Sequence, residues 1–144
     1  MGVLPDDWTV PVPTDLTREW FTSASVAVQT CASCAAMQHP PEEICHRCGA
    51  MEFASTALAP NGTVHSYTIV HYAVHPALAD AVPYAVVLVS LDDAPKIRVV
   101  GNLLDLGPEE VRIGLPVTAV WDRRDVDGET IHLLQWRSAE SSAW

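Results

Sequence analysis

Residues 31–49 read CASCAAMQHPPEEICHRCG and contain all four cysteines of the chain. Two C-x2-C pairs, Cys31/Cys34 and Cys45/Cys48, are separated by ten residues. Two cysteines three positions apart on a tight turn can point into one site, and a second such turn completes a tetrahedron of sulfurs around a metal ion. Gly49 follows the second pair and permits a backbone conformation that a Cβ would oppose. The spacing therefore predicts a four-cysteine zinc ribbon.

Four thiolates leave no open coordination position for water, so the predicted zinc is structural rather than catalytic. Disulfides are disfavoured because nothing in the sequence suggests secretion, and a redox dithiol needs one C-x-x-C in a βαβ context. An iron–sulfur or rubredoxin-like iron site could use the same thiolates and stays open as an alternative. His39 and His46 lie nearby, but four sulfurs suffice without them. Metal binding is expected to contribute to the folding free energy of the ribbon.

From residue 61 onward the pattern indicates β-strands. Asn61-Gly62 suggests a turn, and the alternation that follows slips near Ser66-Tyr67, which suggests a bulge. Pro108-Glu109-Glu110 looks like a single helical turn. The expected strands are 63–74, 84–91, 97–103, 115–122 and 130–137. A long, curled first strand and a helical element between the third and fourth strands predict a five-stranded OB-type barrel.

Upstream of the cysteines, the periodicity predicts an amphipathic helix of about three turns. Leu16, Trp20 and Ala24 recur at every fourth position and fall on one face. Thr14 or Asp15 can cap this helix by accepting a hydrogen bond from a free N–H of the first turn. The helix is expected to belong to the core rather than to a cofactor site.

The fold class expected from these segments is mainly β, and we expect three parts. Residues 1–25 form an arm and a helix, residues 26–56 the rubredoxin-like zinc ribbon, and residues 57–144 the OB-fold. The first thirteen residues hold three of the eleven prolines and no periodic pattern, which indicates an extended arm. Trp8 and Val10 favour an arm that packs on a partner over a free tail.

Composition limits the class of protein. A chain of 144 residues fits one compact domain, with or without a small appendage, and 49% hydrophobic residues exclude a disordered chain. The first residues carry neither a positive region nor an apolar core, so we expect no secretory signal and a cytoplasmic location. Eighteen acidic and eight basic residues give a net charge of -10. Only Arg123 and Arg124 are adjacent, so duplex nucleic acid would be repelled.

Besides the cysteines, several short segments occur in a distinctive order: His39-Pro40-Pro41, Gly62-Thr63-Val64, Ser66-Tyr67-Thr68, residues 83–89, Leu91-Asp92, Gly101-Asn102 and residues 113–117. Together they resemble a known family, the zinc-ribbon plus OB-fold proteins catalogued as the thirty-fifth domain of unknown function. The similarity spans residues 14–136, although this chain has Trp20-Phe21 where the family often has Phe-Trp, and Ala35 where it often has glycine.

The resemblance implies a non-catalytic subunit that binds a thiolase-superfamily enzyme and completes it. Family members accompany archaeal acetoacetyl-CoA thiolase and hydroxymethylglutaryl-CoA synthase, or actinobacterial lipid-transfer-protein-type aldolases that cleave steroid side-chain CoA thioesters. The domain also occurs fused behind a hot-dog-fold hydratase segment, so the chain could be part of a larger subunit. High alanine, valine and arginine usage with a single lysine suggests an actinobacterium, which favours the steroid aldolase as partner and acyl-CoA as a shared ligand.

No catalytic motif is present: the sequence has no Gly-rich phosphate loop, no G-x-S-x-G and no H-E-x-x-H. His65 and His71 share a strand face, but we interpret them as exposed strand residues. We likewise assign Asp92-Asp93 to a turn and Glu109-Glu110 to a helix start. Aromatic residues dominate interface energetics, so the expected anchors for a partner are the tryptophans Trp8, Trp20, Trp121, Trp136 and Trp144.

Two other functions are weaker hypotheses. OB-folds and zinc ribbons also bind single-stranded nucleic acid, which needs a basic groove with aromatic side chains. One lysine and dispersed arginines supply such a groove poorly. A self-sufficient acyl-CoA hydrolase or hydratase would need a catalytic constellation that the sequence does not offer.

Overall fold

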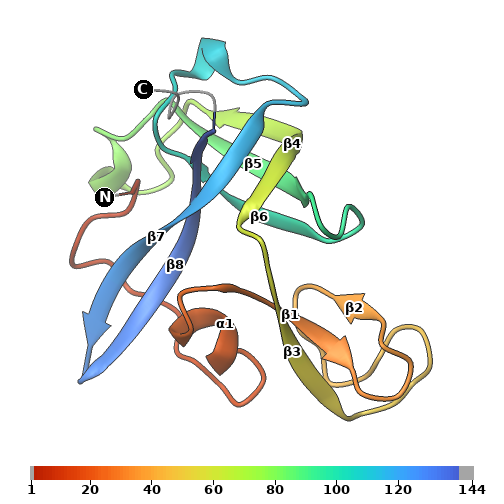
Figure 1. Ribbon diagram of the computed structural model, residues 1–144. Helices are drawn as coiled ribbons and strands as arrows, with labels where there is room; N and C mark the ends of the chain where they lie inside the picture. The colour runs from red at the N-terminus through yellow and green to blue at the C-terminus, as the bar shows by residue number, and fades with distance from the viewer. Residues whose placement is uncertain (1, 140–144) are drawn as a thin grey trace.

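β-strands dominate the fold, as the alternation in the sequence predicts. The computed structural model describes residues 2–139. A five-stranded closed barrel and a separate three-stranded sheet account for the strands in this range (Figure 1). The elements in chain order are α1 (Arg18–Thr22), β1 (Val26–Cys31), β2 (Met37–Gln38), β3 (Phe53–Leu58), β4 (Asn61–Val70), the 3-10 turn η1 (Pro76–Leu78), β5 (Tyr84–Leu91), β6 (Arg98–Leu103), the 3-10 turn η2 (Pro108–Glu110), β7 (Pro116–Val126) and β8 (Glu129–Ser138).

The barrel has the strand order β4-β5-β6-β8-β7 and closes between β7 and β4. Its pairs are antiparallel except for β6 and β8, which run parallel where Leu103 lies opposite Trp136. The helical turn η2 falls between the third and fourth strands, as expected. A five-stranded barrel of this kind is the OB-fold, so the predicted fold class is confirmed.

The first barrel strand contains both a confirmed and a wrong prediction. The register of β4 against β5 shifts between Val64 and Ser66, which is the predicted bulge. The predicted Asn61-Gly62 turn is wrong, because both residues belong to β4 and pair with β7. A Cβ at Gly62 would lie 2.4 Å from the carbonyl oxygen of Ser90. Glycine is therefore needed here for the close approach of β5, not for a turn.

The predicted helix is much shorter than expected. α1 spans five residues, and its N-cap is Thr17, whose side chain makes no capping hydrogen bond. Its predicted caps, Thr14 and Asp15, lie in the preceding turn, where the Thr14 N–H donates to Thr17 Oγ1 at 3.0 Å. Ala24 has a positive φ of 52° and lies beyond the helix. The left-handed backbone ends the helical pattern that the spacing of apolar residues suggested.

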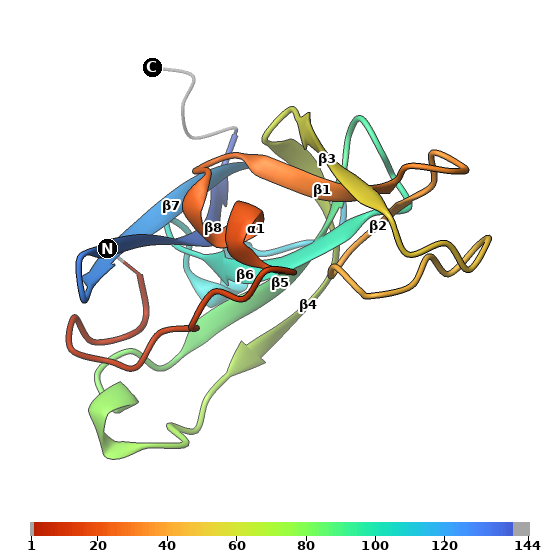
Figure 2. The same ribbon diagram turned by 90° about the horizontal axis from the view of Figure 1, so that it is seen from below.

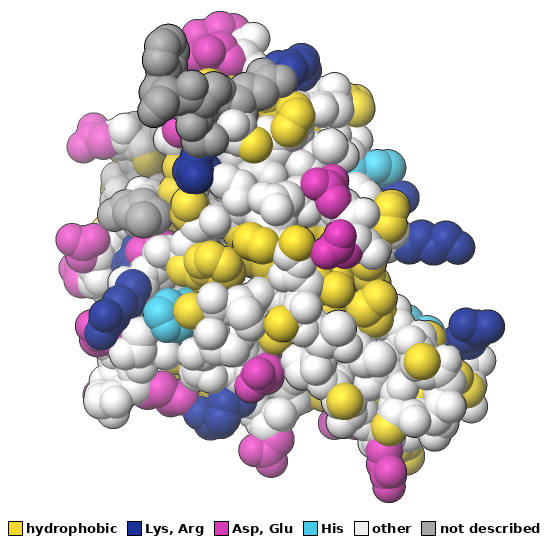
Figure 3. Space-filling model, viewed as in Figure 1, with side chains coloured by type: hydrophobic (Ala, Val, Ile, Leu, Met, Phe, Trp, Pro, Cys, Tyr) yellow, Lys and Arg dark blue, Asp and Glu magenta, His cyan; other side chains and the backbone are white. Residues whose placement is uncertain are grey.

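The three-stranded sheet lies below the barrel in the view of Figure 1, next to α1. Its order is β2-β1-β3, and β1 pairs antiparallel with both neighbours. Val26 and Val28 of β1 belong to the same buried cluster as the barrel residues Val87 and Leu115. Figure 3 shows a band of hydrophobic side chains across the middle of the molecule. One continuous core therefore joins the sheet to the barrel.

The barrel interior is packed around Trp136, which is fully buried. A Cβ at Gly101 on the neighbouring strand would lie 2.9 Å from Trp136 Cδ1 and 3.1 Å from the carbonyl oxygen of Leu134. Gly101 therefore makes room for the indole. The neighbouring Asn102 side chain donates to the carbonyl of Ala85 at 3.1 Å. Gly101 thus allows the indole to pack, and Asn102 links β6 to β5 by a hydrogen bond.

The N-terminal arm, which the sequence suggested would pack on a partner, packs on the chain's own barrel. Arg124 of β7 donates to the carbonyl oxygens of Pro5 at 2.6 Å and Leu4 at 3.0 Å. The same guanidinium pairs with Asp122 at 2.8 Å, with both side chains 6% exposed. Further along the arm, the Trp8 ring lies edge-on to His75 at 4.9 Å. Residues 2–139 include no helix of the length and hydrophobicity needed to cross a bilayer.

Candidate metal centre

The two C-x2-C pairs lie on two equivalent turns. In the first, the Ala35 N–H donates to the carbonyl of Cys31 at 3.0 Å, and in the second the Gly49 N–H donates to the carbonyl of Cys45 at 3.0 Å. Ala35 and Gly49 both have positive φ, 63° and 78°. The first turn therefore places an alanine in the backbone conformation that the second assigns to glycine. Both turns follow the zinc-knuckle geometry predicted from the spacing.

The four sulfurs converge on one point. All four lie within 4.8 Å of one another. Cys31 and Cys48 are 3.6 Å apart, and Cys34 and Cys45 are 3.7 Å apart. Tetrahedral coordination at a Zn–S distance of about 2.3 Å requires sulfurs separated by about 3.8 Å. The cysteines are free thiols, and their separations are too long for disulfides. The cluster can hold a metal ion and fits zinc.

Backbone N–H groups point at the sulfurs and favour thiolates. The N–H groups of Cys34 and Ser33 both donate to the Cys31 sulfur at 3.4 Å. The Cys34 N–H is the main reason that the pKa of Cys31 is lowered. The pKa of Cys45 is lowered to about 6, chiefly by the N–H of Cys48 and next by that of Arg47. Half of the ligand set is therefore prepared for ionisation by the turns themselves.

Cys48 shows the cost of crowding four sulfurs together. Its pKa is raised to about 12, because the closeness of Cys31, burial and the other two sulfurs outweigh the N–H of Ala50, which lowers it. Four neighbouring thiolates repel one another unless a cation lies between them. A bound divalent cation would hold all four in the ionised form. The cluster therefore suits metal coordination, and an ion held by all four sulfurs would have no open coordination position.

A pair of buried glutamines braces the loop between the knuckles, and sequence reasoning did not single them out. Gln38 donates to Gln29 Oε1 at 2.8 Å, and Gln29 donates to the carbonyl of Glu42 at 2.7 Å. The His46 N–H donates to Gln38 Oε1 at 3.0 Å, next to the ligand Cys45. The available signal was a glutamine within the apolar strand run 26–31. A buried amide in a strand needs such partners.

Neither nearby histidine joins the cluster, as predicted. Among residues 2–139, the group of His, Cys, Asp and Glu side chains close enough to share an ion consists of the four cysteines. His46 is exposed. The His39 ring lies 4.3 Å from that of Trp20, and burial lowers the pKa of His39 to about 4. The four sulfurs that the spacing indicated therefore remain the candidate metal ligands.

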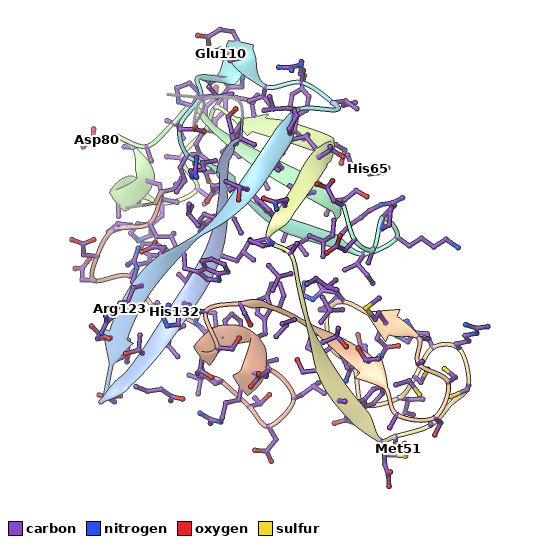
Figure 4. The ribbon with its side chains drawn as sticks, in the orientation of Figure 1. Met51, His65, Asp80, Glu110, Arg123 and His132 are labelled. Atoms are coloured by element: carbon purple, nitrogen blue, oxygen red, sulfur yellow. The ribbon has the colours of Figure 1, made fainter. Side chains whose placement is uncertain are left out.

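The other polar candidates have the ordinary roles expected of them. His65 and His71 are exposed, and Figure 4 shows His65 on the outside of the barrel. Asp93 lies in the turn after β5, where its carboxylate accepts from the Ala59 N–H at 3.3 Å. Glu110 closes η2 by accepting from the Gly107 N–H at 3.2 Å. These carboxylates therefore stabilise a turn and a helical turn.

Tryptophan was expected to supply the anchors for a partner, and the structure corrects this for Trp136, which is fully buried in the barrel. Trp20 and Trp121 are partly buried and pack against the core. Trp8 contacts His75 within the chain. Trp144 lies outside the described residues. The structure therefore removes Trp136 from the candidate anchors and leaves Trp8, Trp20 and Trp121 partly exposed.

A four-cysteine ribbon and an OB barrel sharing one core define a class of small two-part protein, and the comparisons with known proteins identify its family. A family model described as "ChsH2, C-terminal OB-fold domain" matches residues 55–122. A "DUF35 domain-containing scaffold protein" of Methanocaldococcus jannaschii is 34% identical over 100 residues, covering 69% of each chain. The chain belongs to the DUF35 family.

Two other similar proteins extend this comparison. A "Probable enoyl-CoA hydratase alpha subunit" of Thermomonospora curvata is 36% identical over 109 residues, which cover 74% of this chain. The match spans only 33% of that longer protein. A solved structure named "Ltp2-ChsH2(DUF35) aldolase" has a TM-score of 0.75 and 33% identity, and the match covers 90% of this chain and 99% of the other.

Proposed function

We propose that this chain is a non-catalytic accessory subunit, located in the cytoplasm, that binds a thiolase-like acyl-CoA enzyme and completes it. The observation that carries the proposal is the similarity to the Ltp2-ChsH2(DUF35) aldolase, which extends over 90% of this chain and includes both ribbon and barrel. The name of the Methanocaldococcus jannaschii relative, a scaffold protein, supports the same role. The four-cysteine site fits this role, since a zinc there would be structural.

The finer proposal concerns the partner. We infer an aldolase that cleaves a carbon–carbon bond in steroid side-chain CoA thioesters, with the acyl-CoA bound by the partner and enclosed in part by the barrel. The word aldolase in the name of the similar structure and the words enoyl-CoA hydratase in that of the relative support acyl-CoA chemistry. The reacting residues would belong to the partner.

The structure weakens the alternative hypothesis that this chain binds single-stranded nucleic acid. The two adjacent arginines are both engaged within the chain. Arg124 is buried against Asp122, and Arg123 pairs with Asp125 at 3.4 Å on the surface. These ion pairs and a net charge of -10 both disfavour binding to backbone phosphates, which requires a basic groove.

Purification of the tagged chain from its native extract tests the proposal, with retained proteins identified by mass spectrometry. A thiolase-superfamily protein retained in stoichiometric amount is expected, whereas a tag-only control should retain none. The purified pair should then release the retro-aldol products from a steroid side-chain CoA thioester.

Activity of each protein alone completes the test. This chain alone should give no turnover, and the partner alone should be unstable or inactive. Full activity of the isolated partner, or turnover by this chain alone, would contradict an accessory role. Retention of nucleic-acid machinery, with salt-dependent binding of a single-stranded oligonucleotide, would favour the other hypothesis.

A further inference from the structure

An open groove of about 1020 Å³ lies between α1 and the sheet β1–β3. Gln29 of β1 pairs with Ser55 of β3, so their side chains share one face of the sheet, and both line the groove. Val26 and Val28 alternate with them and enter the barrel core from the opposite face. The groove is therefore on the side of the ribbon sheet that faces away from the barrel. In Figure 2, α1 and β1 are turned toward the viewer on this underside.

Apolar side chains line the groove and remain accessible. Leu16 before α1 is 38% exposed, and Met51 before β3 is 69% exposed. Trp20 and Phe53 also line the groove and are only half-buried. Figure 4 shows Met51 at the lower end of the ribbon, far from the barrel. Exposed apolar side chains gathered in one concave place are typical of an interaction site.

The charge of the groove has one sign. Asp15 and Glu19 line it from the α1 side, and Glu43 lines it from the loop between the knuckles. No lysine or arginine is among its lining residues. Arg18 is next to Glu19 in the sequence, but its guanidinium forms an ion pair with Glu129 of β8. The groove thus presents apolar side chains framed by carboxylates, which favours an apolar ligand that carries positive charge at its edges.

We propose that this groove docks a segment of the partner enzyme in which apolar side chains are flanked by lysine or arginine. The proposal rests on the proposed function and adds the surface and the chemistry of the contact. A second copy of this chain is a poor occupant, because its net charge of -10 would be repelled by the acidic edges. A segment of protein suits the groove better than a small molecule, since the groove is open and spans a helix, a sheet and a loop.

A charge-reversal experiment on the complex tests the inference. The double variant Glu19→Lys/Glu43→Lys should raise the Kd for the retained enzyme by about tenfold or more. Asp80→Lys/Glu109→Lys changes the net charge equally at the far end of the molecule, where Figure 4 places Asp80 and the neighbouring Glu110. This control should stay within about twofold. Metal content and circular dichroism establish that both variants fold.

Cross-linking identifies the occupant directly. Met51 is replaced by the photoreactive residue p-benzoylphenylalanine in the full chain, and the complex with the enzyme is irradiated. The cross-linked peptide should come from the enzyme and carry lysine or arginine beside apolar residues. Equal binding by both double variants, or a cross-link to a second copy of this chain or to an acidic segment, would overturn the groove assignment and leave the proposed function intact. If the unaltered chain binds no thiolase-like enzyme, the proposed function fails, and this inference fails with it.

Discussion

At the scale of single residues, close packing around Trp136 leaves no room for a side chain at Gly101. We expect Gly101→Ala to lower the free energy of unfolding by about 1–3 kcal/mol, because the added Cβ overlaps the Trp136 ring and the Leu134 carbonyl. Gly107→Ala is the matched control, since the three atoms nearest to its Cβ all belong to the carboxyl end of the Glu109 side chain, which can rotate away. Urea unfolding measures both, and the control should change by less than about 0.5 kcal/mol. Equal losses in the two variants would contradict this packing argument.

Also at this scale, His39 should make stability depend on pH. Burial lowers its pKa from 6.5 to about 4. Between these two values the unfolded chain binds a proton that the folded chain does not, so stability falls as the pH falls from 6.5 toward 4. The slope approaches about 1.4 kcal/mol per pH unit.

The variant His39→Phe keeps a ring beside Trp20 but cannot titrate, so its stability should depend less on pH between 6.5 and 5. His71→Phe, at an exposed position, should keep the original slope. Urea unfolding at each pH, with metal content measured in parallel, gives the comparison. An unchanged slope in His39→Phe would assign the pH dependence to other groups.

At the scale of elements, the buried pair Asp122–Arg124 attaches the N-terminal arm to β7. We expect Arg124→Met to cost about 3–5 kcal/mol, because it leaves the Asp122 carboxylate buried without its partner. The arm carbonyls of Leu4 and Pro5 also lose their donor, so limited proteolysis should cut residues 2–13 faster.

Two variants control for this interpretation. Arg123→Met removes a surface pair and should cost less than about 1 kcal/mol. The double variant Asp122→Leu/Arg124→Met leaves no isolated charge and should be more stable than Arg124→Met alone. If the arm is cut equally fast in the three variants and in the unaltered chain, the Asp122–Arg124 pair does not hold the arm.

At the scale of the whole molecule, the ribbon should open when its metal is removed. Chelation is expected to raise hydrogen exchange across residues 26–58 while the amides of β5 stay protected. The melting temperature of the barrel should also fall, because Val26 and Val28 belong to the shared core. The same experiment tests the expected division into arm and helix, ribbon and OB-fold.

Cys45→Ser is the genetic counterpart of chelation. It should lose zinc and unfold the ribbon locally, as measured by elemental analysis and hydrogen exchange. Cys45 is buried, and its backbone turn already favours a thiolate, so a serine hydroxyl is a poor substitute as a ligand. Normal metal stoichiometry in this variant would contradict the four-sulfur assignment.

The features that the sequence alone could predict are those encoded by short spacings. The C-x2-C pairs placed four sulfurs in one cluster, and alternation located β5 at Tyr84–Leu91 as well as the bulge in β4. Both signals are local, because a knuckle turn and a β-strand each impose their own period on neighbouring residues. The fold class followed from the order of these segments.

Only the tertiary structure decided the features that depend on distant residues. Apolar spacing predicted a three-turn helix that included Ala24. The observed helix has five residues, and Ala24 lies beyond its end with a positive φ. The need for glycine at position 62 comes from the close backbone of β5 rather than from a turn. The arm is held by Arg124, about 120 positions away in sequence. The groove likewise exists because residues before α1, between the knuckles and in β3 meet in space. Contacts between distant segments set these features, and no period along the chain records them.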